Sequence, residues 1–455
     1  MEMKDYFNDN AELLEEFSSI IQKSYKIEPE LYTKNNVKRG LRNSDGTGVL
    51  VGLTEIGDVH SYIIDEGEKV PVEGRLRYRG IDVYDLVRGF VKEGRFGFEE
   101  TCYLLLFGEL PTEEKLKDFN TLLGSLRALP DTFTEDMILK APSNNIMNKL
   151  ARAVLASYSF DSNPDDNDLT NVLRQSVELI ARFPTMAAYG YQAKRHYHDK
   201  KSLYLHSPQP GLSTAENILY MIRPDRKYTK TEAETLDLAL VLHAEHGGGN
   251  NSTFVTHVVS STGTDTFSAI AAAIGSLKGP LHGGANAKVL KMMEDIKENV
   301  KNWDDETEVA EYIGKIIRKE AFDKSGLIYG MGHAVYTLSD PRAILLKQKA
   351  SVLAKEKEME KEFNLYALIE KLTPEVFAKV KGSSKVMCAN VDMYSGLVYN
   401  MLNIPEELHT PIFAIARIPG WCAHRLEEIV SGCRIIRPAY KSVSSNKEYL
   451  KISER

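Results

Sequence analysis

The chain has 455 residues, 43% of them hydrophobic, and its formal net charge is -7 with a pI near 6.0. At about 150 residues per domain, this length predicts two or three domains with a sizeable buried core. The acidic balance argues against a nucleic-acid-binding protein, and no run approaches the roughly 20 apolar residues of a membrane-spanning helix.

The N-terminal segment Met1–Tyr6 is polar and acidic. It has neither the apolar core of a signal peptide nor the Arg-rich, acid-poor character of an organelle transit peptide, so we expect a cytoplasmic protein. Apolar residues then recur with helical spacing from Glu12 to Ile21, which predicts an amphipathic helix.

Strand-like and helical patterns follow in turn. Alternating or extended segments predict a small sheet from Gly48–Thr54, Val59–Ile64 and Arg75–Gly80. Amphipathic helical spacing is found in Tyr84–Val91, Phe98–Phe107, Glu113–Leu129, Ile146–Tyr158 and Leu169–Phe183. The expected fold class is therefore mainly α, with minor N-terminal β-strands.

The second half begins with an apolar helix. Ser268–Leu277 is apolar on nearly every face, which predicts a helix at the centre of the molecule or at a subunit contact. Gly279-Pro280 marks its end. A charged helical region, Val289–Leu372, follows, and the extended segment Ser384–Val391 leads into an acidic motif.

Two histidines stand at glycine-rich breaks. His282 lies in Gly-Pro-Leu-His-Gly-Gly-Ala-Asn286 and His333 in Gly330-Met-Gly-His-Ala-Val-Tyr, while Asp392 follows in Asn390-Val-Asp392. Glycine beside an imidazole leaves room for another molecule to approach the ring. If a helix begins just after His282, its dipole disfavours the imidazolium, and a neutral ring can donate a hydrogen bond to an enolate. Carbon-acid chemistry is one reading; a loop histidine with structural hydrogen bonds is the other.

Three arginines stand among apolar residues or beside these motifs. Arg342 follows Asp340-Pro341, Arg417 ends an apolar run, and Arg437 lies between Ile436 and Pro438. A charge in apolar surroundings needs a partner. Either a di- or tricarboxylate ligand or internal salt bridges would supply it.

His243-Ala-Glu-His246 offers two histidines at helical spacing that could bind a metal. It is not an H-E-x-x-H motif and no third ligand lies nearby, so a substrate-binding loop fits better, with Asn250 after three glycines as a hydrogen-bonding residue. We expect no metal and no disulfide, since the cysteines form no C-x-x-C pair. They are Cys102, Cys388, Cys422 and Cys433.

These motifs together resemble those of citrate synthases. Weaker similarity, such as Glu73-Gly74 and Phe107-Gly-Glu-Leu-Pro111, reaches back to about residue 40. The matching motifs, in family order, are His243 to His246, Gly279 to Asn286, Gly330 to Tyr336, Asp340-Pro-Arg342, Asn390-Val-Asp392 with Ser395-Gly396, Ala414 to Arg417 and Arg437-Pro438.

The resemblance implies a reaction and a role for each motif. Asp392 would remove a methyl proton from acetyl-CoA, His282 would bind the enolate oxygen, and His333 would polarise or protonate the keto group of oxaloacetate. Citryl-CoA is then hydrolysed, and no cofactor beyond the substrates is implied. The residues implied to hold oxaloacetate are His246, Asn250, Arg342, Arg417 and Arg437.

The resemblance also implies an architecture. Residues 1–282 and 398–455 would form a large helical domain on the oxaloacetate side, and 283–397 an inserted small, mobile domain on the CoA side that closes over oxaloacetate. Arg437 would reach the neighbouring subunit's site, which implies a homodimer, although hexamers occur among similar proteins.

The CoA contacts depart from the resembling pattern. Gly330, Met331 and Gly332 would take the adenine through their backbone, but Thr337 and Gln192 stand where some family members have phosphate-binding arginines. Arg42, Lys194 and Arg195 could replace them or could be solvated surface charges.

Two alternatives to citrate synthase remain. A 2-methylcitrate synthase would use propionyl-CoA, and one methylene changes discrimination by only about 1–3 kcal/mol. A non-catalytic protein that binds CoA or a carboxylate on the same scaffold is the other, against which the joint presence of His282, His333 and Asp392 argues.

Overall fold

The computed structural model describes residues 10–66, 68–333, 335–382 and 386–455. Met1–Tyr6, Ala334 and Ser384, which belong to predicted segments, therefore lie outside the described residues. By their internal contacts, the residues form two compact units, 1–53 and 54–455. The predicted division into 1–282 with 398–455 and 283–397 stays a prediction.

The unit 1–53 carries two short helices. α1 spans Ala11–Ser24 and confirms the helix predicted from Glu12 to Ile21. α2 spans Pro29–Lys34 and begins with a proline, whose missing N–H costs no bond in the first turn. A 3-10 turn, Arg39–Leu41, follows.

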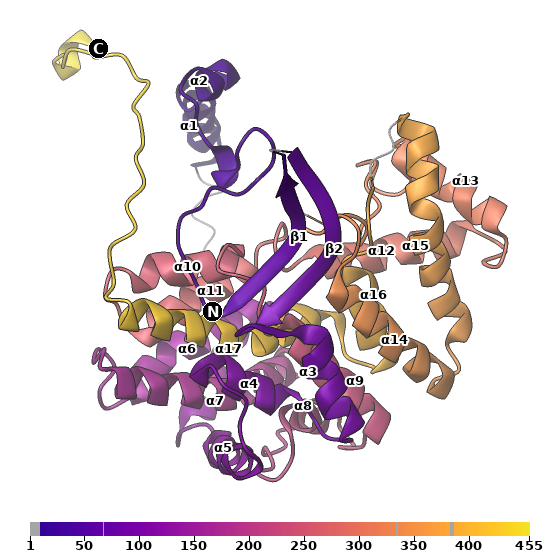
Figure 1. The fold of residues 1–455 in the computed structure, drawn as a ribbon. Helices are drawn as coiled ribbons and strands as arrows, with labels where there is room; N and C mark the ends of the chain where they lie inside the picture. The colour runs from indigo at the N-terminus through magenta and orange to yellow at the C-terminus, as the bar shows by residue number, and fades with distance from the viewer. Residues whose placement is uncertain (1–9, 67, 334, 383–385) are drawn as a thin grey trace. The chain divides into compact units, whose positions relative to one another are not determined.

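The unit 54–455 opens with a three-stranded antiparallel sheet in the order β1–β2–β3. β1 (Gly57–Asp65) and β2 (Glu68–Tyr78) form the long hairpin of Figure 1, and β3 is Ile81–Asp82. Their register runs from Gly57 opposite Tyr78 to Asp65 opposite Glu68. The strand predicted at 59–64 is confirmed. Of the predicted extended segment 75–80, residues 75–78 form the end of β2, and Arg79 and Gly80 form the turn to β3.

The strand predicted at Gly48–Thr54 is wrong. In the described part of the chain this segment forms one isolated bridge, between Arg42 and Gly48, and joins no ladder. Alternation of apolar and polar residues favours a strand, but the backbone groups of a strand also need a partner.

Helices make up most of the unit 54–455 (Figure 1), so the fold is mainly α as predicted. The helices predicted at the positions of α3 to α6 agree with the structure to within three residues. Their bounds are α3 Val83–Lys92, α4 Phe98–Phe107, α5 Glu113–Leu126, α6 Ile146–Ser157, α7 Leu169–Tyr197, α8 Thr214–Ile222, α9 Lys230–His243, α10 Asn251–Ser260, α11 Thr266–Leu277, α12 Ala285–Asn299, α13 Glu306–Ile317, α14 Pro341–Glu356, α15 Glu360–Lys381, α16 Asp392–Met401 and α17 His409–Val430, with a π-helical turn at Thr134–Leu139.

α7 is much longer than predicted because it continues past Pro184. Proline breaks a backbone hydrogen bond and usually ends a helix. Nearly every residue from Phe183 to Ala193 is buried, however. Burial of this second half against α8 and α17 outweighs the local cost of the proline.

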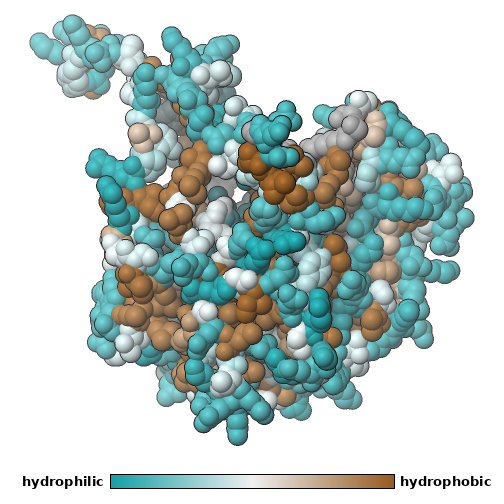
Figure 2. All heavy atoms as spheres, in the orientation of Figure 1, coloured by the Kyte–Doolittle hydropathy of each residue, from teal (hydrophilic) through white to brown (hydrophobic). Residues whose placement is uncertain are grey.

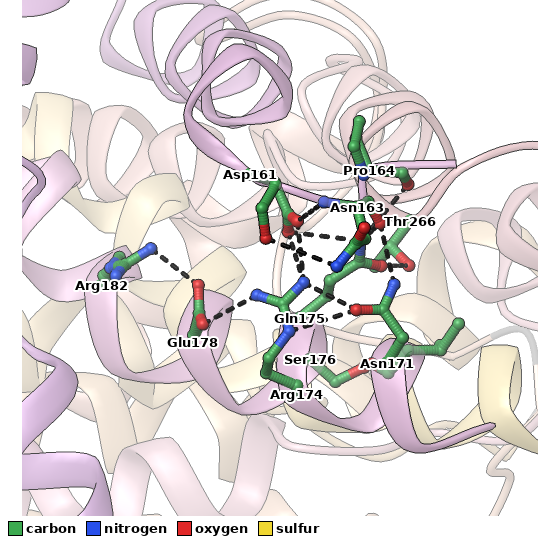
Figure 3. A network of polar contacts seen from close by, with 12 residues as sticks. Asp161, Asn163, Pro164, Asn171, Arg174, Gln175, Ser176, Glu178, Arg182 and Thr266 are labelled. Carbon is green, nitrogen blue, oxygen red and sulfur yellow. Dashed lines mark hydrogen bonds and ion pairs between the residues drawn. The ribbon is translucent and has the colours of Figure 1, made fainter. Parts of the chain in front are cut away.

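α11 is buried on most of its surface and contacts α6, α10 and α17, as expected for a central helix. A polar network ties its first residue to α7 (Figure 3): the Thr266 hydroxyl donates to Gln175 Oε1 at 2.5 Å, and Arg174 Nη2 donates to Asp161 at 2.8 Å. Glu178 accepts from both Arg174 and Arg182 at 2.9 Å. Each of these polar groups has a protein partner.

The helices α12 to α16 gather on one side of the unit 54–455, in orange in Figure 1. α13, α14 and α16 contact α15, while α14 and α16 also contact α9. Two loops approach each other within this group: Gly332 N donates to Cys388 O at 2.7 Å, and Asn390 N donates to Gly330 O at 2.9 Å. This pairing joins the glycine-rich motif to the acidic motif.

Figure 2 shows hydrophilic and hydrophobic side chains interspersed over the helical part of the chain. Among the described residues, no helix is both long enough and apolar enough to cross a membrane. The four cysteines are free thiols.

Candidate active site

The first part of the site lies where α9 ends. His243 is the last residue of that helix, and its Nδ1–H donates to the Ala239 carbonyl at 2.7 Å. The chain then turns through Gly247, whose φ is 78°, and begins α10 after Asn250. His246 is buried in this turn, and its Nε2 has no hydrogen-bond partner among the described residues. Burial, followed by the charges of Arg342 and neighbouring groups, holds the pKa of His246 well below its ordinary value.

His333 is held by its own loop. Its Nδ1 accepts from two backbone N–H groups, Val335 at 2.9 Å and Tyr336 at 3.0 Å. A nitrogen that accepts from N–H donors carries no proton, so the neutral ring must carry its proton on Nε2. Burial and then Arg342 lower the pKa of His333 to about 4. The ring is therefore a neutral donor at pH 7, with Nε2–H on the side of Arg342.

Aromatic packing fixes His333 against His246. The two rings lie edge to face with centroids 5.3 Å apart, and the Tyr336 ring lies 4.8 Å from His333 and 5.6 Å from His246. The hairpin supports this cluster, since Gly74 N donates to Ser339 Oγ at 3.1 Å. A Cβ on Gly74 would overlap the Ser339 carbonyl and the Tyr336 ring, which explains the need for glycine there.

Arg342 has an internal partner, Asp340, so of the two alternatives left open by the sequence the internal salt bridge is present for this arginine. Its Nε and Nη2 bind both oxygens of Asp340, at 3.0 and 2.8 Å, and the pair is almost completely buried. Burial alone would lower the pKa of Arg342, but Asp340 raises it above its ordinary value. The Asp-Pro start of α14 was the available signal, because an N-cap aspartate places its carboxylate over the first turn. Arg342 Nη2 also lies 3.3 Å from His333 Nε2.

Only one of the three guanidinium nitrogens of Arg417 has a hydrogen-bond partner in the described part of the chain. Arg417 is fully buried in α17, and its Nε donates to the His243 carbonyl at 2.6 Å. Its two terminal nitrogens have no hydrogen-bond partner in the described part of the chain. Burial lowers the pKa of Arg417 to about 10, and nearby Glu245 opposes that effect. The guanidinium stays charged at pH 7 and presents two free N–H groups, as a carboxylate ligand requires.

His282 lies two residues before Gly284, the N-cap of α12. Its Nε2 accepts a hydrogen bond from the backbone N–H of Ser252 at 3.4 Å and lies 3.1 Å from the Ser252 hydroxyl oxygen. Trp421 Nε1 donates to the same hydroxyl oxygen. Because a backbone N–H can only donate, the proton of the neutral ring belongs on Nδ1. Burial and then Arg417 lower the pKa of His282 to about 4. The ring is neutral as expected, and burial is the largest cause.

Asp392 is the first residue of α16 and is partly exposed. Its backbone N–H donates to Asn390 Oδ1 at 3.0 Å, and Asn390 Nδ2 donates to Gly332 O at 2.8 Å. Desolvation raises the pKa of Asp392 to about 6, with Arg342 acting in the opposite direction. The Asn390 side chain therefore couples the position of this acid to the loop that carries His333.

The structure brings most of the predicted site residues together. The charges of Arg342 and Arg417 both act on His246, and the guanidinium of Arg417 lies 4.8 Å from the Phe413 ring, which also contacts His282. Neutral imidazoles, two guanidiniums and one carboxylate of raised pKa thus share one buried region. Such a set can bind a small dicarboxylate and move a proton from carbon.

Other predicted residues are placed differently. Asn250 Oδ1 accepts from the Ser252 hydroxyl at 3.0 Å, so it orients the partner of His282. Asn286 bonds to Ser395 at 2.6 Å and to His409 at 3.1 Å and thereby ties α12 to α16 and α17.

The basic side chains predicted to bind CoA or to reach the neighbouring subunit's site are paired with other residues or exposed to solvent. Lys194 Nζ is paired with Asp199 at 2.8 Å and Glu407 at 3.0 Å, and Arg195 contacts Gln192 at 3.3 Å. Arg437 is exposed in the C-terminal tail. Arg42 belongs to the unit 1–53 and donates to Gly46 O at 3.3 Å. Their proposed contacts with CoA or with a second subunit stay predictions.

Comparison with known proteins decides the family. Residues 44–439 match the family described as citrate synthase, C-terminal domain. The chain is 36% identical over 406 residues to a citrate synthase of Haloferax volcanii, covering 88% of this chain and 94% of that protein. It belongs to the citrate synthase family.

Two further citrate synthase relatives bear on the substrate and the fold. The chain is 33% identical over 428 residues to 2-methylcitrate synthase 1 of Corynebacterium glutamicum, which covers 92% of this chain and 99% of the relative. A solved citrate synthase of Thermoplasma acidophilum, in ternary complex with carboxymethyl coenzyme A and oxaloacetate, superposes with a TM-score of 0.73 at 26% identity and covers 92% of this chain and 99% of that one. The chain is thus an acyltransferase of this family with the citrate synthase fold.

Proposed function

We propose that this protein is a citrate synthase, which condenses acetyl-CoA with oxaloacetate and hydrolyses citryl-CoA to citrate and CoA. The observation that carries the proposal is the buried Arg417, whose two terminal nitrogens lack a partner in the described structure beside the equally unpaired His246 Nε2. A buried cation with unpaired N–H groups is costly unless an anion completes it. One carboxylate of oxaloacetate completes it here, and Arg342 binds the other.

His333 acts on the keto group of oxaloacetate. Its proton lies on Nε2, because Nδ1 accepts from Val335 N and Tyr336 N. Nε2–H donates to the keto oxygen and stabilises the alkoxide that forms when the carbonyl carbon is attacked. The Arg342 guanidinium beside Nε2 favours the same negative charge.

Asp392 and His282 act on acetyl-CoA. The Asp392 carboxylate takes a proton from the methyl group, and the resulting enolate oxygen accepts the Nδ1–H of His282. The enolate carbon then attacks the keto carbon of oxaloacetate, and the resulting alkoxide takes the proton of His333 Nε2–H to give citryl-CoA. Water then cleaves the thioester to release citrate and CoA, and the proton held by Asp392 balances the one that His333 gave up. A carboxylate whose pKa is raised to about 6 is a stronger base than an ordinary aspartate and is still ionised at pH 7.

The remaining family features are part of the same proposal. Residues 283–397 close over oxaloacetate as a small domain, and CoA binds through Gly330, Met331 and Gly332 with phosphate contacts from Arg42, Lys194 or Arg195. The reaction needs no cofactor beyond its substrates. A homodimer, supported by the small residues Ser268 and Ala272 on the incompletely buried face of α11, lets Arg437 reach the neighbouring site.

Similarity to a 2-methylcitrate synthase over 92% of the chain makes propionyl-CoA the second candidate substrate. Release of the CoA thiol with acetyl-CoA and with propionyl-CoA, at matched oxaloacetate, decides between them. We expect the higher kcat/KM with acetyl-CoA. A clear preference for propionyl-CoA would make the protein a 2-methylcitrate synthase, and no oxaloacetate-dependent thiol release with either would favour a non-catalytic binder.

A further inference from the structure

A second cluster of titratable side chains lies between α10 and α17 and takes no part in the proposed reaction. His257 of α10 and His424 of α17 face each other, with His257 Nε2 3.1 Å from His424 Nδ1. Glu427, one turn further along α17, has its Oε2 3.6 Å from His424 Nδ1. These three ligand atoms lie within 4.8 Å of one another.

A carboxylate lies close to the outer nitrogen of each ring. Glu428 Oε2 lies 3.0 Å from His257 Nδ1, and Glu245 Oε2 lies 3.1 Å from His424 Nε2. In a neutral ring, an outer N–H that is directed at a carboxylate leaves the inner nitrogen unprotonated. Both inner nitrogens then present lone pairs to each other at 3.1 Å, an arrangement that requires a cation between or beside them.

The same arrangement is typical of histidines that ligate metals, which almost always give their other ring N–H to a carboxylate or carbonyl. A tetrahedral zinc ion with Zn–N bonds of about 2.0–2.1 Å separates its ligand atoms by about 3.3 Å. Two of the three separations, 3.1 and 3.6 Å, bracket that value, and all three ligand atoms lie within 4.8 Å of one another. Glu427 Oε1 accepts from Glu55 N at 2.8 Å, while its Oε2 has no hydrogen-bond partner among the described residues.

The site is accessible to an ion. Gly248 lies beside the two rings, where a Cβ would be in van der Waals contact with His257 Nε2 at 3.7 Å and His424 Cε1 at 3.8 Å. His424 is fully buried, but the side chains of His257 and Glu427 are 14% and 16% exposed. An ion can therefore enter from solvent, and water can complete its coordination.

We propose that His257, His424 and Glu427 bind a divalent transition metal of the Zn²⁺ class, with Glu245 and Glu428 orienting the two histidines. The ion joins α10 to α17. Its role is structural, because none of its ligands is among the residues proposed to contact oxaloacetate or acetyl-CoA.

A proton is the competing occupant. Burial alone would lower the pKa of His424, but Glu245 and Glu427 raise it to about 9, so an imidazolium could fill the same place. A metal and a proton differ in what can be measured. Metal binding has a fixed stoichiometry, changes the spectrum of a cobalt-substituted protein and depends on Glu427 as a ligand.

The test uses the full-length protein after treatment with EDTA and desalting. Titration with ZnCl₂ is expected to give one tightly bound ion per chain by calorimetry and by metal analysis, and Co²⁺ is expected to give visible d–d absorption. His257→Gln and Glu427→Gln remove ligands and should abolish both signals. Glu428→Gln, which removes only the partner of a ligand, should weaken binding about 10- to 100-fold.

Controls separate this site from adventitious binding. His198 is exposed at the end of α7, and His198→Gln should leave the stoichiometry unchanged. Circular dichroism and oxaloacetate-dependent thiol release show whether each variant is folded; if His257→Gln is not, Glu427→Gln decides. Equal zinc binding by the native protein and folded Glu427→Gln, or binding lost only in His198→Gln, would overturn the proposal and leave the proton as the occupant.

Discussion

Arg417 and Arg425 lie eight residues, or about two turns, apart on α17 and are both fully buried, yet their surroundings differ. Arg425 donates to four protein oxygens: Thr266 Oγ1 at 3.0 Å, Ser260 Oγ at 3.2 Å, and Asn167 Oδ1 and Thr264 O at 2.8 Å. Arg417 donates to one, the His243 carbonyl, and keeps two unpaired nitrogens.

The contrast distinguishes a structural cation from one reserved for a ligand. Arg425 extends the polar network of α7 and α11 in Figure 3, and that network stabilises the fold because each charged side chain in it has hydrogen-bond partners. The unpaired nitrogens of Arg417 cost stability until an anion binds. Substitutions in the site should therefore reduce activity, whereas those in the network should reduce stability.

Asp392→Asn should have the largest effect on activity. Removing the base is expected to lower kcat about 10²- to 10⁴-fold, as measured by thiol release at saturating substrates. Oxaloacetate should still bind, as calorimetry would show. A variant that keeps more than a tenth of the native kcat would mean that another group takes the proton.

The same substitution tests the stability side of the comparison. The pKa of Asp392 is raised from 3.8 to about 6 in the folded protein, so its contribution to stability is present below pH 3.8 and is lost as the pH rises through 6. At pH 8 the charged carboxylate is a cost to folding. Asp392→Asn should then unfold at an equal or higher denaturant concentration than the native protein.

Arg417→Gln and Arg425→Gln should separate function from stability. Arg417→Gln is expected to lose about 2–5 kcal/mol of oxaloacetate binding, or roughly 30- to 5,000-fold in KM or Kd, with a small change in unfolding free energy. Arg425→Gln strands several buried acceptors and should lose about 3 kcal/mol of stability.

Each arginine variant is the control for the other. Oxaloacetate titration and urea unfolding of both proteins give the four values needed. If folded Arg425→Gln shows the larger increase in the KM for oxaloacetate, Arg417 is not the ligand-binding arginine of α17 and Arg425 is not only a structural one.

The pH dependence gives the next largest effect. As the pH falls through about 6, Asp392 gains a proton and can no longer act as a base, so kcat/KM should fall about tenfold per pH unit. His282 and His333 have pKa values near 4 and stay neutral over this range. Activity measured from pH 5 to 8 should show one acidic limb. Activity that stays constant down to pH 5 would mean that the base is not a group with a pKa near 6.

Local sequence signals predicted much of the fold, and they failed where distant residues decide. α4 was predicted to the residue, but α7 runs past Pro184 because of tertiary burial, and Gly48–Thr54 alternates like a strand without finding a partner. Propensity and periodicity describe a segment, whereas burial and pairing depend on the rest of the chain.

The candidate site shows the same limit. His282, His333 and Asp392 could be singled out because glycines or a helix start stand next to them in the sequence. The tautomers of His282 and His333 could not be predicted from the sequence, because they depend on backbone N–H groups that only folding brings to each ring. The cluster of His257 and His424 joins residues 167 positions apart, and no local pattern indicates it.

The smallest predicted effect concerns the support of His333 by the hairpin. Gly74→Ala places a Cβ against the Ser339 carbonyl and the Tyr336 ring, so we expect a loss of about 1–3 kcal/mol in stability. Because Tyr336 contacts His333, kcat should also fall in the protein that remains folded.

Gly89→Ala is the matched control. Gly89 lies inside α3 with open space around its Cβ position, so alanine there should stabilise the helix by about 0.5–1 kcal/mol and leave kcat unchanged. Urea unfolding and thiol release on both variants measure the two effects separately. If Gly74→Ala loses stability but keeps its full kcat, the hairpin supports the fold without positioning His333. The loop that carries His333 would then position this histidine without help from the hairpin.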